Sequence, residues 1–109
     1  MAIDKSLISG STSILILRLL EDKDMYGYEM IETLEKKSNN VFTLKAGTLY
    51  PLLHSLEEKG CLTAYESEAN GKVRKYYSIT KSGRKYLKSK KEEWNEYQTA
   101  VVKVLCISC

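Results

Sequence analysis

Residues 61–80 hold two segments in which apolar and polar residues alternate, CLTAYESEA and KVRKYYSIT, joined by Asn70-Gly71. Asn-Gly between two such segments is the strongest short-range signal for a β-hairpin with a type I′ turn, since both turn residues need positive φ. A two-residue turn also fixes the register, so Leu62 is expected opposite Ile79. Any fold for this chain must therefore contain this hairpin.

The alternation predicts which face of the hairpin packs on a core. Lys72 and Arg74 project from the face expected to be exposed, with Ser67 and Ala69. Lys75 is expected to pair with Glu66 across the strands. The residues expected on the buried face are Leu62, Ala64, Tyr77 and Ile79.

Apolar residues three and four positions apart predict three helices before the hairpin. The first spans about 5–21, the second runs from an N-cap at Asp24 to about Lys37, and the third spans about 46–59. The first is apolar over much of its circumference, which suggests burial on more than one side. The residues of the second and third helices expected to face inward are Tyr28, Met30, Ile31, Leu34, Leu49, Leu52, Leu53 and Leu56.

After the hairpin, Thr80 is expected to cap a last helix over about 81–105. Its apolar residues follow a heptad-like spacing, and a helix of this length cannot bury its stripe on a domain this small. A homodimer built from the first and last helices is the simplest solution. The dimer-interface residues expected on the last helix are Leu87, Trp94, Tyr97, Val101 and Val104.

The order of helix, helix, helix, two-stranded hairpin and helix is that of a winged helix-turn-helix. The predicted fold class is therefore mainly α with a two-stranded β wing and a long C-terminal dimerisation helix. Residues 1–80 would form the winged helix-turn-helix domain, and residues 81–109 the dimerisation helix and tail. Such folds place the third helix in the DNA major groove, but a protein-interaction module without DNA binding could use the same order.

Positive charge is concentrated in the middle of the chain. Residues 45–91 contain eleven Lys and Arg against four Asp and Glu, a net charge of +7, whereas residues 1–44 and 92–109 each have a net charge of −2. Such a block suggests a polyanionic partner, although a solvated lysine-rich face explains it equally well.

Membrane and secretory classes are not supported by the sequence. The apolar run at residues 14–17 is ended by Arg18, far short of the ~20 residues of a membrane span. The N-terminus lacks the basic segment of a signal peptide, and three cysteines do not make a disulfide framework. We expect a cytoplasmic protein with no membrane partner.

The stretch AGTLYPLLH at residues 46–54 places a glycine and the single proline at the start of the third helix. Recognition helices contact bases with their N-terminal residues, and a glycine there lets the backbone approach a phosphate closely. A capped helix start with a harmless kink explains the same residues without DNA. The residues expected to face outward are Gly47, Thr48, Tyr50, Pro51 and His54.

Three segments resemble the PadR family of bacterial transcriptional regulators. They are residues 26–29 (YGYE), residues 46–60 with their AGTLYPLL start, and residues 71–80 (GKVRKYYSIT), with Gly83 just beyond. The resemblance spans about residues 7–104 and is to the short members with a single C-terminal helix. It implies a dimeric winged-helix repressor that binds a palindromic operator and often responds to small aromatic or hydrophobic molecules.

One position departs from the family pattern. Family members often have Ser-Pro ahead of the Gly-Thr pair, where this chain has Lys45-Ala46. A positive charge at this end of a helix is unfavourable unless an anion such as a phosphate lies nearby, although Thr43 or a water could supply the cap. Tyr26 could contact a phosphate or serve in packing. The DNA-binding residues expected are Tyr26, Lys45, Gly47, Thr48, Tyr50, Pro51, His54, Asn70, Gly71, Lys72 and Arg74.

Trp94 is the single tryptophan and lies on the heptad stripe of the last helix. Packing at the interface is one interpretation. The resemblance to multidrug-responsive PadR-like regulators implies another, in which a tryptophan pair on this helix encloses a planar aromatic effector. The effector-binding residues expected are Trp94, Tyr97, Leu7, Ser11 and Leu15.

The chain ends in Cys106-Ile107-Ser108-Cys109. Reactive CxxC thiols lie at helix N-termini, where the dipole lowers their pKa, whereas this motif follows a helix C-terminus. We expect incidental thiols in a frayed tail; a metal- or redox-sensing regulator is the alternative. With one histidine, His54, and no GxSxG or phosphate-binding glycine loop, we expect no enzyme, no cofactor and no metal.

Overall fold

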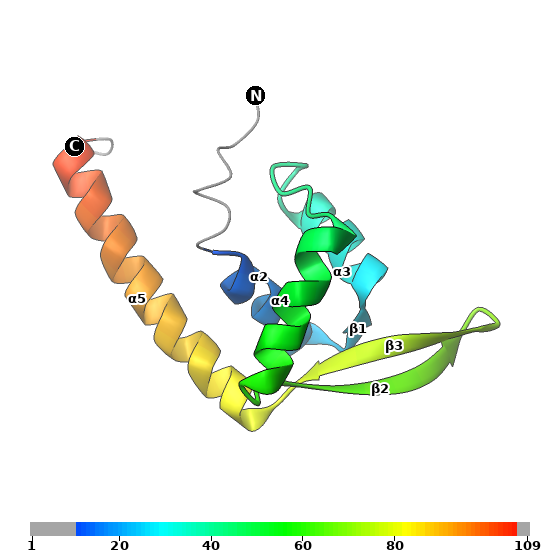
Figure 1. Cartoon of the computed structure of the whole chain (residues 1–109). Coiled ribbons are helices and arrows are strands. Elements are labelled where there is room, and N and C mark those ends of the chain that lie inside the picture. The colour runs from blue at the N-terminus through cyan, green and yellow to red at the C-terminus, as the bar shows by residue number, and fades with distance from the viewer. Residues whose placement is uncertain (1–10, 107–109) are drawn as a thin grey trace.

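The computed structural model describes residues 11–106. Figure 1 shows α2, α3 and α4 grouped together, with a long hairpin projecting to one side and α5 extending on the other. Residues 5–10 of the predicted first helix lie outside the described residues. The elements are α2 (Thr12–Asp22), β1 (Met25–Tyr26), α3 (Gly27–Lys37), α4 (Ala46–Glu58), β2 (Leu62–Ala69), β3 (Lys72–Ile79) and α5 (Lys81–Leu105).

The hairpin has the predicted register. Strands β2 and β3 pair antiparallel from Leu62 opposite Ile79 to Ala69 opposite Lys72. Asn70 and Gly71 have φ of 52° and 77°, as the turn requires. Leu62, Tyr77 and Ile79 on the inner face are buried, which confirms the predicted core side of the wing.

The sheet also contains a third strand that the sequence reading missed. Met25 and Tyr26 form β1, which pairs with Tyr77 and Tyr76 of β3, so the strand order is β1-β3-β2. The predicted N-cap at Asp24 is therefore wrong, because α3 begins only at Gly27. Sheet pairing satisfies the backbone of residues 25–26 and buries Met25, which a longer helix would not do here.

The core lies between the three grouped helices and the inner face of the sheet. Two expectations about it are wrong. Tyr28 is 59% exposed, since Met30 and Leu34 occupy the inward side of α3. Leu87, expected at the dimer interface, is fully buried in this core. The largest fully buried side chains are Tyr77, Ile16, Leu17, Leu20, Met30, Leu49, Leu53, Leu56, Leu62 and Leu87.

The predicted N-cap at Thr80 is confirmed, and it connects three elements. The Thr80 hydroxyl accepts a hydrogen bond from the Gly83 N–H at 2.9 Å and donates one to the Gly60 carbonyl at 2.6 Å. The Thr80 N–H donates to the Cys61 carbonyl at 3.0 Å. The start of α5 is thus held against the end of α4 and the base of the wing.

The C-terminal end of α2 contacts other elements through its acidic side chains. Glu21 lies 3.5 Å from Lys91 and 4.0 Å from Arg84, both on α5. Asp22 lies 3.4 Å from Lys37 on α3, and its ion pairs with Arg18 and Lys37 lower the pKa of its carboxyl. No helix within residues 11–106 is both long and apolar enough to cross a membrane.

Candidate nucleic-acid interface

Helix α4 begins without a side-chain cap. Lys45 occupies the N-cap position in an extended conformation, and its carbonyl accepts hydrogen bonds from the Thr48 and Leu49 N–H groups at 3.0 and 2.9 Å. Thr43 is therefore not the cap. An α-helix leaves its first N–H groups without intrahelical partners and carries partial positive charge at this end. The exposed Lys45 adds to that charge, so this end of α4 favours an anion.

Four of the five outward residues predicted on α4 are exposed. Gly47, Thr48, Pro51 and His54 lie on the solvent side, opposite the buried leucines. A Cβ built on Gly47 would meet no atom within 4 Å. The helix continues through Pro51 to Glu58, although proline at this sixth position removes the hydrogen bond that a backbone N–H there would donate to the Gly47 carbonyl. The exposed surface of α4 thus has few bulky side chains.

Tyr50 differs from the prediction. Its side chain is half-buried, and its ring and hydroxyl occupy the space that a Cβ on Gly27 would need. Burial raises the pKa of Tyr50 above its usual value of 10. Tyr50 therefore packs α4 against the start of α3, and the signal that sequence reasoning overlooked is Gly27.

The tip of the wing carries exposed residues that could reach a second polyanionic surface. Asn70, Gly71 and Lys72 are all exposed. Lys75 is paired in register with Glu66, yet its ammonium lies over the Tyr77 ring, 5.4 Å from the centroid, and not on the carboxylate. An exposed ion pair is worth little, so the ring contact competes with it successfully.

The outer face of the sheet holds a row of aromatic rings made by Tyr26, Tyr76 and Tyr65. The Arg74 guanidinium lies 4.3 Å from the Tyr26 ring centroid. Tyr26 meets Tyr76 edge-on at 5.5 Å between centroids, and Tyr76 stacks on Tyr65 at 5.8 Å. The Tyr65 hydroxyl donates a 2.6 Å hydrogen bond to Asp24, which raises the pKa of Tyr65. The two-residue turn places Tyr65 opposite Tyr76, but the sequence could not add Tyr26, because β1 was missed.

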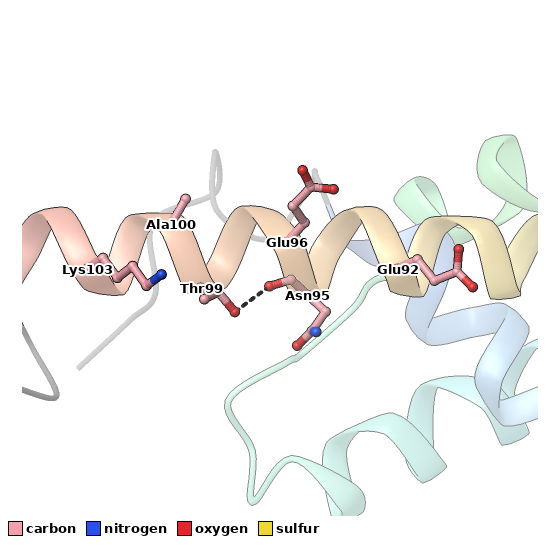
Figure 2. Close-up of a pocket in the computed structure, with 6 residues that line it drawn as sticks. All are labelled: Glu92, Asn95, Glu96, Thr99, Ala100 and Lys103. Carbon is pink, nitrogen blue, oxygen red and sulfur yellow. Dashed lines mark hydrogen bonds between the residues drawn. The ribbon is translucent and has the colours of Figure 1, made fainter.

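The predicted effector residues are only partly brought together. Trp94 and Tyr97 are neighbours on α5, with centroids 6.1 Å apart and both rings exposed. Ser11, the N-cap residue of α2, and Leu15 within α2 are half-buried, and α2 packs against α5. Leu7 lies outside the described residues. Figure 2 shows the residues that line a pocket along α5, and they include none of these residues. It is lined by Glu92, Asn95, Glu96, Thr99, Ala100 and Lys103.

The cysteines do not form a site in the described part of the chain. Cys106 is exposed at the C-cap of α5, Cys61 is buried, and Cys109 lies outside the described residues. Within residues 11–106, no group of three or more His, Cys, Asp and Glu side chains is arranged to hold a metal ion.

Several solved structures with this architecture are of transcriptional regulators. A transcriptional regulator from Clostridium thermocellum superposes with a TM-score of 0.87 and 35% identity, covering 94% of this chain and 97% of that one. A PadR family regulator from Clostridium difficile gives 0.75 and 36%, covering 87% and 98%. The transcriptional regulator YqjI of Escherichia coli is 30% identical over 84 residues, which are 77% of this chain and 39% of YqjI.

Sequence matching to families agrees with these structures. Residues 16–89 match the family described as transcriptional regulator PadR-like, a segment that runs from α2 through the wing into α5. The family and the solved regulators from Clostridium thermocellum and Clostridium difficile are thus all described as transcriptional regulators. This chain belongs to the PadR-like family of transcriptional regulators.

Proposed function

We propose that this chain is a cytoplasmic homodimeric repressor that recognises a palindromic DNA operator, with α4 in the major groove and the wing on the flanking backbone. One observation carries the proposal. The exposed side of α4 at Gly47, Thr48 and Pro51 is uncrowded, and its N-terminus joins helix-dipole charge to the charge of Lys45. A surface of this kind fits close approach of a backbone to phosphate.

The side chains on α4 make direct base readout sparse. Thr48 can hydrogen-bond a base edge or a phosphate, and Pro51 can only make apolar contact. Specificity would then depend on DNA shape as well as on base contacts. The wing would add sequence-independent affinity through Lys72 and Arg74.

The homodimer is supported by apolar side chains on α5. Trp94, Tyr97 and Val104 are 43%, 64% and 82% exposed in the single chain. Together with Val101 they form a stripe that a second copy could cover. A twofold dimer would present two copies of α4 to two half-sites.

The function is tested by fluorescence anisotropy on duplex DNA from upstream of the chain's own gene, against a scrambled duplex, across a salt series. We expect the native duplex to be preferred by about 4 kcal/mol or more at physiological salt. Replacing Gly47 by alanine should weaken operator binding about tenfold, ~1.4 kcal/mol, because the new methyl group stands where the DNA backbone must come close.

The same Gly47→Ala variant should fold at least as well as the wild type. Its Cβ meets nothing in the protein, and alanine is favoured over glycine in helices by up to ~1 kcal/mol. Ser89→Ala, on an exposed turn of α5, is the matched control and should change neither property. No duplex binding by the wild type even at low salt would instead favour a winged-helix module that binds protein.

We further propose that Trp94 and Tyr97 bind a planar aromatic effector in the dimer. Trp94 is the single tryptophan, so its emission reports on this site alone. Adding a planar acridine dye should quench it saturably, and Tyr97→Ala should weaken the quenching. Unchanged Trp94 emission up to the solubility limit of the dye would exclude such a site.

A further inference from the structure

The side chain of Arg74 is held in an arrangement that folding by itself does not explain. Its guanidinium lies over the Tyr26 ring, and its Nε–H is buried with no hydrogen-bond partner in the described structure. A buried N–H without an acceptor is unfavourable, the more so on a cation. None of the ion pairs within residues 11–106 includes Arg74. Glu29 pairs with Lys23, and Asp24 accepts the hydrogen bond of the Tyr65 hydroxyl.

We propose that Tyr26 is a positioning residue for Arg74, so that the wing presents a preset guanidinium to a phosphate of the DNA. The proposal rests on the DNA-binding function proposed above. Because Nε is covered, only the two terminal Nη groups remain for an incoming anion. These two groups form the fork that matches the oxygens of a phosphate.

The Tyr26 ring is held in place by the backbone of β1 and by its contact with the Tyr76 ring. Tyr26 belongs to β1, which pairs with β3 and leads directly into α3 (Figure 1). Its far side meets Tyr76, which stacks on Tyr65, whose hydroxyl binds Asp24. The row therefore links the wing to the loop before β1 as well as to β1 itself.

Holding Arg74 in place has a specific benefit for binding. A free arginine loses much side-chain conformational entropy when it binds a phosphate, and an arginine already ordered on a ring loses less. A cation over an aromatic ring is stabilised by the ring itself, without needing the tyrosine hydroxyl. A direct contact between the Tyr26 hydroxyl and a phosphate would need the hydroxyl, whereas positioning of Arg74 needs only the ring. The two explanations can therefore be told apart.

The experiment compares Tyr26→Phe, Tyr26→Leu, Arg74→Met and the Tyr26→Leu/Arg74→Met double variant by anisotropy on the native duplex. We expect Tyr26→Phe to bind like the wild type and Tyr26→Leu to bind roughly 2- to 12-fold more weakly, the usual effect of having to order one long side chain on binding. Arg74→Met should flatten the salt dependence by about one unit of slope per protomer. In the Arg74→Met background, Tyr26→Leu should have no further effect.

A second readout needs no DNA. The Nε–H resonance of Arg74 in the free protein should be shifted upfield by the ring current in the wild type and in Tyr26→Phe, but not in Tyr26→Leu. Thermal unfolding of each variant identifies any loss that comes from a damaged fold.

Three results would overturn the proposal. Equal losses in Tyr26→Phe and Tyr26→Leu would show that the hydroxyl contacts DNA directly. Wild-type binding by Tyr26→Leu would show that Arg74 needs no positioning. If Tyr26→Leu weakened binding in the Arg74→Met background as much as it does in the wild type, the two residues would act separately. Failure of the DNA-binding function is distinct, because the wild type itself would then bind no duplex while the Arg74 resonance stayed shifted.

Discussion

Replacing Gly83 by alanine is expected to destabilise the fold by about 3 kcal/mol or more, since overpacking against a fixed backbone cannot be relieved by a rotamer change. A Cβ at Gly83 would collide with the carbonyl oxygen of Cys61 and with the side chain of Ile79. That carbonyl also accepts the Thr80 N–H, so it cannot move without breaking the junction of α4, the wing and α5. Thermal unfolding should show Tm lowered by more than about 10 °C.

Ser82→Ala is the control for this prediction. Ser82 is one residue earlier on the same helical turn and is exposed, so its replacement should change the free energy of unfolding by less than about 0.5 kcal/mol. A Gly83→Ala protein with wild-type Tm would show that α5 and Cys61 are not in the close contact described here.

Replacing Leu87 by alanine should lower the free energy of unfolding by about 2–5 kcal/mol, the usual result of emptying a fully buried leucine site. Leu87 is completely buried in the core, although its place in the heptad-like pattern suggested a dimer contact. If it belongs to the core, the loss measured by denaturant unfolding should persist at every protein concentration. A loss that vanishes when the dimer is saturated would restore the interface interpretation.

Leu105→Ala makes the same chemical change near the other end of α5. Leu105 is 61% exposed in the single chain, so its replacement should have an intrinsic effect below about 1 kcal/mol. Any larger effect would come from dimerisation and should depend on protein concentration, because the stability of a dimer does. The two leucines thus separate core from interface.

Much of the fold could be predicted because its signals are local. Asn70-Gly71 determines a turn, and a two-residue turn determines the register of all eight facing pairs of β2 and β3. The leucine spacing of α4 and the Thr80 cap of α5 are likewise contained in a few consecutive residues. Strand β1 had no such signal: Met25-Tyr26 is a two-residue strand that exists only because β3 lies beside it.

The candidate site was predictable where exposure follows from helix or strand periodicity. Gly47, Thr48, Pro51 and His54 are exposed as expected, because the opposite side of α4 holds the buried leucines. Tyr50 was predicted to face solvent, yet its side chain is half-buried. Helix periodicity gives the direction of the Cβ, but not the contacts that a long aromatic side chain makes beyond it. Its contact with Gly27 depends on how α3 crosses α4, which is a property of the packing.

The sequence by itself determined the order of the helices and the hairpin, the wing register and the concentration of charge in residues 45–91. Each depends on residues close together in the chain, where propensity, periodicity and turn chemistry act. Only the tertiary structure decided that Leu87 belongs to the core and that Tyr26 lies beneath Arg74. Tyr26 and Arg74 are 48 positions apart in the chain. Such a contact forms only when the packing of whole elements brings their surfaces together.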